Sequence, residues 1–255
     1  RDTVVPPLPP TPRPARYEFV LCKGGGVRIS LKGESYPVES TYSYPHGGEN
    51  KLSAADAPDS KGENAWNLKT ERIDDSTYRV TAGGKYYRIN REIRLERTRV
   101  LVKDTIANVS GADLGIILSN HINAQGKEGI KTQVLAAPNP PGYVRAKDHG
   151  LGILPLDDVY QVQQRTYTGD GICGVRSNSF GLAKGASYTL EWAVYPNNSP
   201  DYYNFLNAVR KDEGLNNRTV DGCLAITHSG KWLREPPPRG LVEFGGVKYA
   251  SSGCV

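Results

Sequence analysis

The chain has 255 residues, a length that fits one large β domain or two small ones and can bury a core without metals or many disulfides. Its 32 basic and 27 acidic residues give a formal net charge of +5. The two signs are interleaved, as in residues 91–97, which we assign to the solvated face of a strand, so nucleic-acid binding is not expected. No apolar run approaches the roughly 18 residues of a membrane helix, so no membrane span is expected.

At the N-terminus, residues 1–16 form a Pro-rich segment that favours an extended polyproline II conformation. The segment is interpreted either as a stiff linker or stalk, or as an arm that docks in a groove of a neighbouring subunit. Thr11 within it is a candidate O-glycan site. The residues assigned to the assembly arm are Val4, Val5, Pro6, Pro7, Leu8, Pro9 and Pro10.

Alternating apolar and polar residues after this arm predict consecutive antiparallel strands. Turns are expected at residues 23–26, 74–75, 83–84 and 170–171, and residues 45–63 are expected to form a long polar loop. The glycine run at 23–26 lacks the Lys-Ser/Thr and the helix of a phosphate loop, and therefore indicates a hairpin. The predicted strands cover residues 17–22, 27–31, 66–73, 77–82, 86–95, 99–108, 114–122, 129–136, 160–166, 171–177, 186–195 and 223–226.

One helix is predicted at about 200–213. Ser199 is the expected N-cap, Pro200 occupies the first helical position, and Gly214 ends the helix. Its apolar stripe follows i, i+3, i+4, i+7 spacing and should pack across a sheet; the stripe consists of Tyr202, Phe205, Leu206 and Val209. Residues 236–255 are interpreted as a C-terminal extension that begins with prolines.

The cysteines are widely spaced and form no CxxC pair, so no metal site is expected and no cofactor is implied. An even number fits two disulfides with three connectivities, and buried free thiols are the alternative. The disulfide candidates are Cys22, Cys173, Cys223 and Cys254.

Three N-x-S/T sequons begin at Asn108, Asn197 and Asn217, and Pro200 after the second weakens it as a glycan acceptor. The chain contains no Met and begins at Arg1, which we interpret as the processed N-terminus left by removal of a signal peptide. We therefore expect a secreted, extracellular glycoprotein that carries covalent glycans.

Residues 87–110 resemble the galactose-mutarotase-like supersandwich, in which a tight turn joins two strands and the second ends in a D-x-(I/L)-x-N corner, here Asp104-Thr-Ile-Ala-Asn108. The resemblance continues into residues 114–121. A second block, residues 188–212, resembles the end of the β-sandwich module that precedes a barrel in large glycoside-hydrolase-like proteins. The resemblance implies an all-β, mainly antiparallel supersandwich of two large packed sheets over residues 17–235, and an association with carbohydrates. It also implies that a catalytic barrel would begin near Val255, beyond this chain.

Mutarotases use His and a carboxylate for acid–base chemistry at a sugar. Of the four His in this chain, His121 at a predicted strand end is the weak catalytic candidate, and a structural strand-end role is its alternative. His46 is interpreted as a loop residue. No partner His and no catalytic Glu can be matched to the family.

Glycoside hydrolysis would require two facing carboxylates, and nothing in the sequence singles out a pair. The available acids are Glu39, Asp74, Asp75, Asp157, Asp158 and Glu191. Trp66 and Trp192 could stack on sugar rings, although the alternating pattern around Trp192 assigns it to the core.

Without an identified catalytic set, the sequence favours a non-enzymatic structural glycoprotein, the subunit of a head-to-tail polymer or filament in which the arm binds another copy of the chain. The alternative is a carbohydrate-binding or carbohydrate-active domain, either mutarotase-like or accessory to a glycosidase. A third interpretation is an adhesive or wall-anchored monomer with a Pro-rich stalk.

Overall fold

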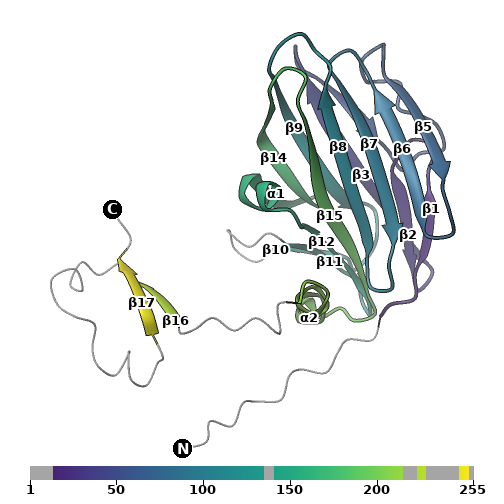
Figure 1. The fold of residues 1–255 in the computed structure, drawn as a ribbon. Helices are drawn as coiled ribbons and strands as arrows, with labels where there is room; N and C mark the ends of the chain where they lie inside the picture. The colour runs from purple at the N-terminus through teal and green to yellow at the C-terminus, as the bar shows by residue number, and fades with distance from the viewer. Residues whose placement is uncertain (1–13, 135–140, 215–222, 228–246, 253–255) are drawn as a thin grey trace, which may run out of the picture. The chain divides into compact units, whose positions relative to one another are not determined.

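The computed structural model describes residues 14–134, 141–214, 223–227 and 247–252. They fall into two compact units, Arg1–Ala208 and Val209–Val255. The first unit is a sandwich of two large antiparallel sheets (Figure 1), which confirms the expected all-β class. The expected assembly arm falls largely within residues 1–13, which lie outside the described residues.

One sheet, called the β3 sheet below, has seven strands in the order β1-β2-β3-β9-β14-β13, with β4 paired to β3. Its strands are β1 (Glu18–Leu21), β2 (Val27–Leu31), β3 (Glu34–Tyr44), β4 (Gly48–Leu52), β9 (Leu114–Asn123), β13 (Gln164–Gly169) and β14 (Ile172–Leu182). The hairpin between β13 and β14 turns at Asp170 and Gly171, whose φ angles of 48° and 78° fit the expected two-residue turn.

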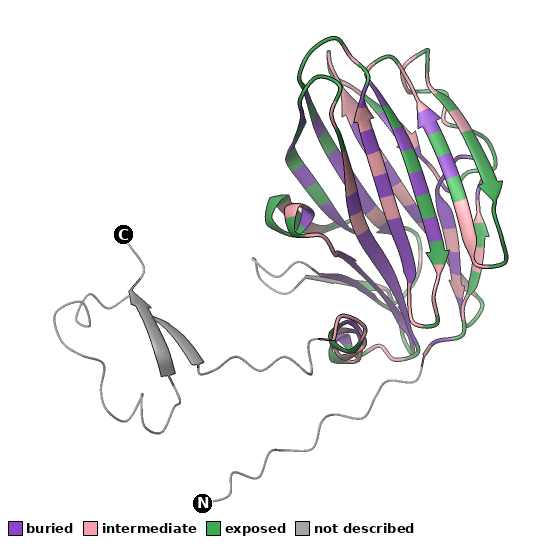
Figure 2. Cartoon of the chain, in the orientation of Figure 1, coloured by how far each residue is buried: buried purple, intermediate pink, exposed green. Residues whose placement is uncertain are grey.

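The other sheet, called the β8 sheet, has eight strands in the order β10-β11-β12-β15-β8-β7-β6-β5. Its strands are β5 (Asn67–Arg72), β6 (Thr77–Gly83), β7 (Tyr87–Leu95), β8 (Val100–Asn108), β10 (Lys131–Val134), β11 (Gly142–Arg145), β12 (Gly150–Pro155) and β15 (Ser187–Asn197). Alternate residues along β7 and most of β8 are buried (Figure 2), as a sandwich with one solvated face per sheet requires, whereas β12 is buried along its whole length.

Several elements differ from the sequence prediction: β3, β11 and β12 were not predicted as strands, and three further segments differ as follows. The expected loop at 45–63 contains β4, because this short strand extends β3 as a hairpin. The predicted strand at 160–166 begins as the helix α1 (Asp158–Gln163), because the Asp157 side chain accepts a hydrogen bond from the Tyr160 backbone N–H at the N-cap. The predicted strand at 223–226 is β16 (Cys223–Thr227), which pairs in parallel with β17 (Val247–Ser252) and belongs to neither large sheet.

The predicted C-terminal helix is α2 (Tyr202–Asp212). It begins two residues later than expected because the Asp201 carboxylate, and not Ser199, accepts the Tyr203 backbone N–H at 3.0 Å. Phe205 packs against Tyr143 with ring centroids 5.5 Å apart, and a Cβ at Gly152 would collide with the Phe205 ring. The expected packing of the stripe across a sheet is therefore confirmed for Phe205. Within the described residues, no helix is long and apolar enough to cross a bilayer.

A buried ion pair lies between the two sheets. The Arg91 Nε donates to Asp104 Oδ1 at 2.6 Å, and both side chains are 3% exposed or less. The second Asp104 oxygen accepts from Arg91 Nη2, from the Tyr42 hydroxyl and from the Trp192 indole N–H. Burial alone would lower the pKa of Arg91, but the Asp104 charge and hydrogen bonds raise it. Both charges are therefore held in a fully hydrogen-bonded environment.

The pair extends into the opposite sheet as a polar network. Arg91 Nη2 donates to the Ser40 hydroxyl at 2.8 Å, and Ser40 donates to Asn120 Oδ1 at 2.6 Å. The Asn120 amide then donates to the Tyr160 hydroxyl at 2.9 Å. Together with Tyr42, Trp192 and the ion pair, these residues form what we call the central network. It corrects the assignment of Arg91 to a solvated strand face, since this residue is only 2% exposed.

Two of the expected glycan sites are internal anchors. Asn108 is 3% exposed, and its amide nitrogen donates to the backbone carbonyls of Ala112, Leu182 and Ala183. Asn197 is 7% exposed, and its amide nitrogen donates to the Tyr143 hydroxyl. A glycan on either nitrogen would break these bonds, so the glycosylation expected at Asn108 and Asn197 does not fit the fold. Asn217 and Thr11 lie outside the described residues.

Both sequons have a structural explanation. The Asn108 side-chain oxygen accepts the backbone N–H and the hydroxyl of Ser110, and the Asn197 oxygen accepts the backbone N–H of Ser199. The N-x-S spacing is therefore that of an Asx turn at a strand end.

Of the disulfide candidates, Cys22 and Cys173 are buried free thiols, the alternative that the sequence left open. Burial raises the pKa of Cys173 to about 12. The side chains of Cys223 and Cys254 lie outside the described residues.

Replacing Asp104 with Ala is expected to lower the free energy of unfolding by about 3–5 kcal/mol, because it leaves the Arg91 charge buried without a partner. Urea denaturation measures this change. The matched control is Glu191→Ala, which breaks the partly exposed 2.7 Å pair with Lys103 and should cost about 1 kcal/mol or less. Equal losses in the two variants would contradict the assigned role of the buried pair.

Secretion of the chain from a glycosylating host is expected to give folded protein without a glycan on Asn108 or Asn197, since their amide nitrogens are enclosed and hydrogen-bonded. Peptide mapping by mass spectrometry checks each sequon separately. Folded protein that carries a glycan on every Asn108 would contradict the hydrogen bonds assigned to this side chain.

Candidate functional site

Four neighbouring strands of the β3 sheet carry one row of residues on its outer face. In the register of the sheet, Glu39 on β3 lies opposite His121 on β9, His121 lies opposite Gly174 on β14, and Gly174 lies opposite Tyr167 on β13. We call this set the Glu39–His121 row. The structure thus supplies His121, the catalytic candidate of the sequence, with a carboxylate neighbour.

The outward direction of this row follows from the central network. Ser40 and Asn120 are buried between the sheets, and successive residues of a strand point to opposite faces. Their neighbours Glu39 and His121 therefore face outward. Their side chains are 26% and 12% exposed, which leaves the pair accessible at the surface.

A backbone hydrogen bond fixes the position of the Glu39 carboxylate. Its Oε1 accepts the backbone N–H of Ala54 at 2.9 Å, while Oε2 lies 3.7 Å from His121 Nε2. The interaction with the His121 imidazole is the largest cause that lowers the pKa of Glu39; burial opposes this, and hydrogen bonds from the Ala54 amide and Asn123 add to the lowering. Glu39 is therefore ionised at neutral pH and acts as a fixed acceptor.

His121 has an unusual second nitrogen. Its Nδ1 is buried and has no hydrogen-bond partner among the described residues. Buried polar atoms in native structures nearly always have partners.

Beyond His121 the row continues with a glycine. A Cβ at Gly174 would lie 2.5 Å from the Asn120 carbonyl oxygen and 2.6 Å from the His121 Cβ, so only glycine fits where β14 approaches β9. Tyr167 follows on β13, with its Cα about 10 Å from that of His121 across two strand spacings, and its side chain hydrogen-bonds with Ser119 of β9. Burial raises the pKa of Tyr167, while Ser119 and Arg176 oppose this. The phenol therefore keeps its proton at neutral pH.

A parallel second row lies beside the first. It consists of Thr41, Ser119, Arg176 and Arg165 on the same strands. The Thr41 and Ser119 hydroxyls lie 2.7 Å apart, and Arg176 Nε donates to Asn178 Oδ1 at 2.8 Å. The second row thus adds hydroxyl and guanidinium groups next to the carboxylate–imidazole pair.

The other acids considered in the sequence take structural roles. Asp74 accepts the backbone N–H groups of Ser76 and Thr77 in a turn, and Asp157 caps α1. Asp75 pairs with Arg72, and Glu191 pairs with Lys103. Asp158 is exposed in the first turn of α1. Among the described residues, Glu39 is the one of these six acids that lies within 4 Å of a histidine nitrogen.

The remaining candidates do not form a sugar platform. Trp192 is 1% exposed in the core, as expected, and donates to Asp104. Trp66 packs edge-on against Tyr87, with ring centroids 6.0 Å apart. His46 is exposed in the β3–β4 turn with a φ of 75°. Tyr167 and Arg176, which belong to the site, were not singled out from the sequence, because only the strand register brings them near His121.

The sequence matches no protein-family model and no curated protein sequence. Solved structures show similarity at the level of the fold. A galactose mutarotase related enzyme from Lactobacillus acidophilus is 8% identical, with 75% of this chain and 98% of that chain covered and a TM-score of 0.46. The Slr1438 protein from Synechocystis sp. is 10% identical, with 76% and 100% covered and a TM-score of 0.46. A polysaccharide lyase is 14% identical, with 73% of this chain but 32% of the lyase covered, and a TM-score of 0.45.

Replacing His121 with Leu is expected to raise the pKa of Glu39 toward its ordinary value, because the side chain that contributes most to lowering this pKa is lost. Ionised Glu39 stabilises the fold above its unfolded pKa of about 4.3, and this contribution is lost as the pH falls through the lower folded pKa. An NMR titration of the side-chain carboxyl carbons measures the shift. Asp148, whose pKa His149 and Lys32 lower to about 2, is the internal control and should not change.

Proposed function

We propose that this chain is a carbohydrate-active protein whose Glu39–His121 row transfers protons at the anomeric centre of a sugar. The observation that carries the proposal is the 3.7 Å separation of Glu39 Oε2 and His121 Nε2 on an accessible sheet face. The proposal matches the alternative interpretation of the sequence. The filament interpretation depends on an arm that lies largely outside the described residues and stays a prediction.

The separation suits an inserted hydroxyl group. At 3.7 Å the two atoms are too far apart for a good direct hydrogen bond. An oxygen placed about 2.8 Å from each of them would bridge the pair, as water does between polar groups separated by more than 3.5 Å. Such a hydroxyl donates to Glu39 Oε2 and accepts from the His121 Nε2–H. This is the geometry of a bound sugar hydroxyl that is about to lose its proton.

The reaction that fits is opening of the sugar ring. Glu39 takes the proton of the anomeric hydroxyl, the C1–O1 bond becomes a carbonyl, and the C1–O5 bond breaks toward O5. Tyr167 supplies the proton that O5 needs. Rotation about C1–C2 and the reverse steps return both protons and give the other anomer, so atoms and charges balance without a cofactor.

The two proton carriers must lie on opposite sides of the ring. Glu39 and His121 are on one side of Gly174, and Tyr167 is on the other. Arg176 and Ser119 in the second row supply donors for the remaining sugar oxygens.

Polarimetry on a panel of aldoses, with ligand-observed NMR for binding, tests the proposal. The wild-type chain is expected to accelerate anomer interconversion. Replacing Glu39 with Gln should reduce the rate by about 100-fold or more while binding persists, because an amide cannot take the proton. Tyr167→Phe should reduce the rate similarly with little effect on binding.

The matched control is His46→Ala, which removes an exposed histidine of the β3–β4 turn and should leave the rate unchanged. If no aldose binds and no rate rises above the buffer reaction, the proposal fails. If sugars bind but Glu39→Gln does not alter a measured turnover, Glu39 is not the proton acceptor.

A further inference from the structure

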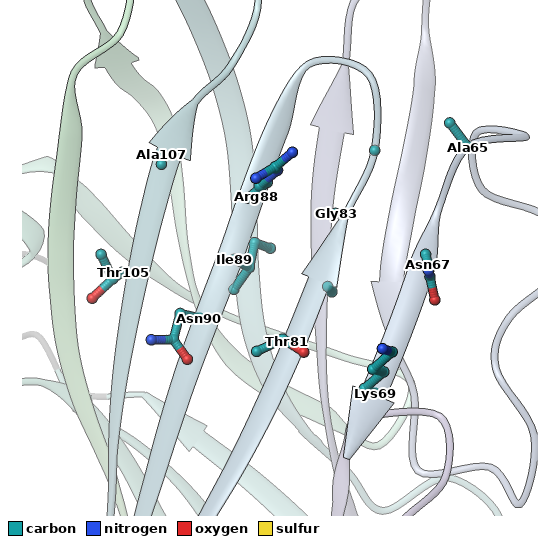
Figure 3. A pocket seen from close by; sticks show the side chains of 12 residues that line it. Ala65, Asn67, Lys69, Thr81, Gly83, Arg88, Ile89, Asn90, Thr105 and Ala107 are labelled. Carbon is teal, nitrogen blue, oxygen red and sulfur yellow. The ribbon is translucent and has the colours of Figure 1, made fainter. Parts of the chain in front are cut away.

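The outer face of the β8 sheet contains a groove of about 680 Å³, within the roughly 300–1,000 Å³ range of ligand sites. Figure 3 shows that its side chains come from β5, β6, β7 and β8. The groove is on the opposite sheet from the Glu39–His121 row. It therefore constitutes a separate surface, and nothing in the proposed proton transfer requires it.

One row of the groove consists of hydrogen-bonding side chains. The strand register aligns Lys69, Thr81, Asn90 and Thr105 across four neighbouring strands. Lys69, Thr81 and Asn90 are exposed, and Thr105 shares a 2.8 Å hydrogen bond with Thr189. The row thus offers one cation, one amide and two hydroxyls.

The adjacent row holds a second cation. Arg88 pairs with Gly83 on one side and with Ala107 on the other, and Asn67 lies beyond Gly83. An ideal Cβ on Gly83 would approach Arg88 Cγ to 3.2 Å, so the absence of a side chain there lets the arginine lie across β6. Arg88 is therefore flanked by a glycine and an alanine.

Neither cation has a carboxylate partner. No ion pair joins Lys69 or Arg88 to an acid among the described residues, while the neighbouring charged row is paired internally through Glu71–Arg79 and Lys103–Glu191. Glu63, close to Gly84, accepts from the Asn50 amide and the Lys85 backbone N–H. Two unneutralised cations, roughly 12 Å apart at Cα from the strand spacings, therefore face the groove.

We infer that this groove binds an acidic oligosaccharide, a chain of sugar units that bear carboxylate groups. Lys69 and Arg88 bind the carboxylates, and the Asn and Thr side chains bind the hydroxyls between them. The groove offers no aromatic face for a neutral pyranose to stack on. Two cations are also too few for a nucleic-acid backbone, whose binding requires neutralisation of many phosphates.

Calorimetric titration with a galacturonic acid pentamer tests the inference, with the neutral galactose pentamer as the paired ligand. The wild-type chain is expected to bind the acidic pentamer, more weakly as salt rises, and to bind the neutral pentamer at least tenfold more weakly. Lys69→Met and Arg88→Met should each weaken binding roughly tenfold, the loss of one charge-assisted hydrogen bond.

Arg145→Gln is the matched control, because it removes one positive charge from β11 at the other end of the same sheet and should not change the affinity. Glu39→Gln should also bind the pentamer normally, which separates this inference from the proposed proton transfer. Equal affinity for the acidic and neutral pentamers, equal loss in Arg145→Gln, or tighter binding of a single-stranded DNA oligomer would overturn it.

Discussion

The ion pair between Arg91 and Asp104 is the constraint on which the sandwich depends. Removing two charges from water costs several kcal/mol each, so the pair is tolerable only if its remaining hydrogen-bonding capacity is filled. Tyr42 and Ser40 from one sheet and Trp192 from the other provide these bonds. The buried charges are therefore stabilised only when both sheets are present and correctly aligned.

This alignment determines the surface chemistry. Because side chains alternate across a strand, a shift of one residue in β3 or β9 would turn Ser40 and Asn120 outward and Glu39 and His121 inward. Such a shift would leave Arg91 without its partners on the opposite sheet. The central network thus penalises the registers that would destroy the Glu39–His121 row, and the position of the outer site follows from a network that no substrate reaches.

The sequence predicted most strands of the two sheets and the turn at 170–171, but not β3, β11 or β12, and its choice of His121 as a catalytic candidate stays a prediction. It did not predict the burial of Arg91, because charge was taken as a sign of exposure. The alternation along β7 nevertheless places Arg91 on the same face as the buried residues Tyr87, Ile89 and Ile93. Nothing in the sequence favoured Glu39 over the other five acids, because only the pairing of β3 with β9 places it opposite His121. The sequons were taken as glycan sites because an Asx turn and a sequon have the same spacing.

The two outer faces use glycine for different purposes. On the β3 sheet, Gly174 allows the backbone of β9 at Asn120 and the His121 Cβ to approach β14 closely. On the β8 sheet, Gly83 gives Arg88 room to lie across a neighbouring strand. Regular strands would otherwise present an even layer of side chains, and a missing Cβ is the smallest change that makes a depression in it. Because the sheet interior already fixes register, such a change can create a binding surface without disturbing the core.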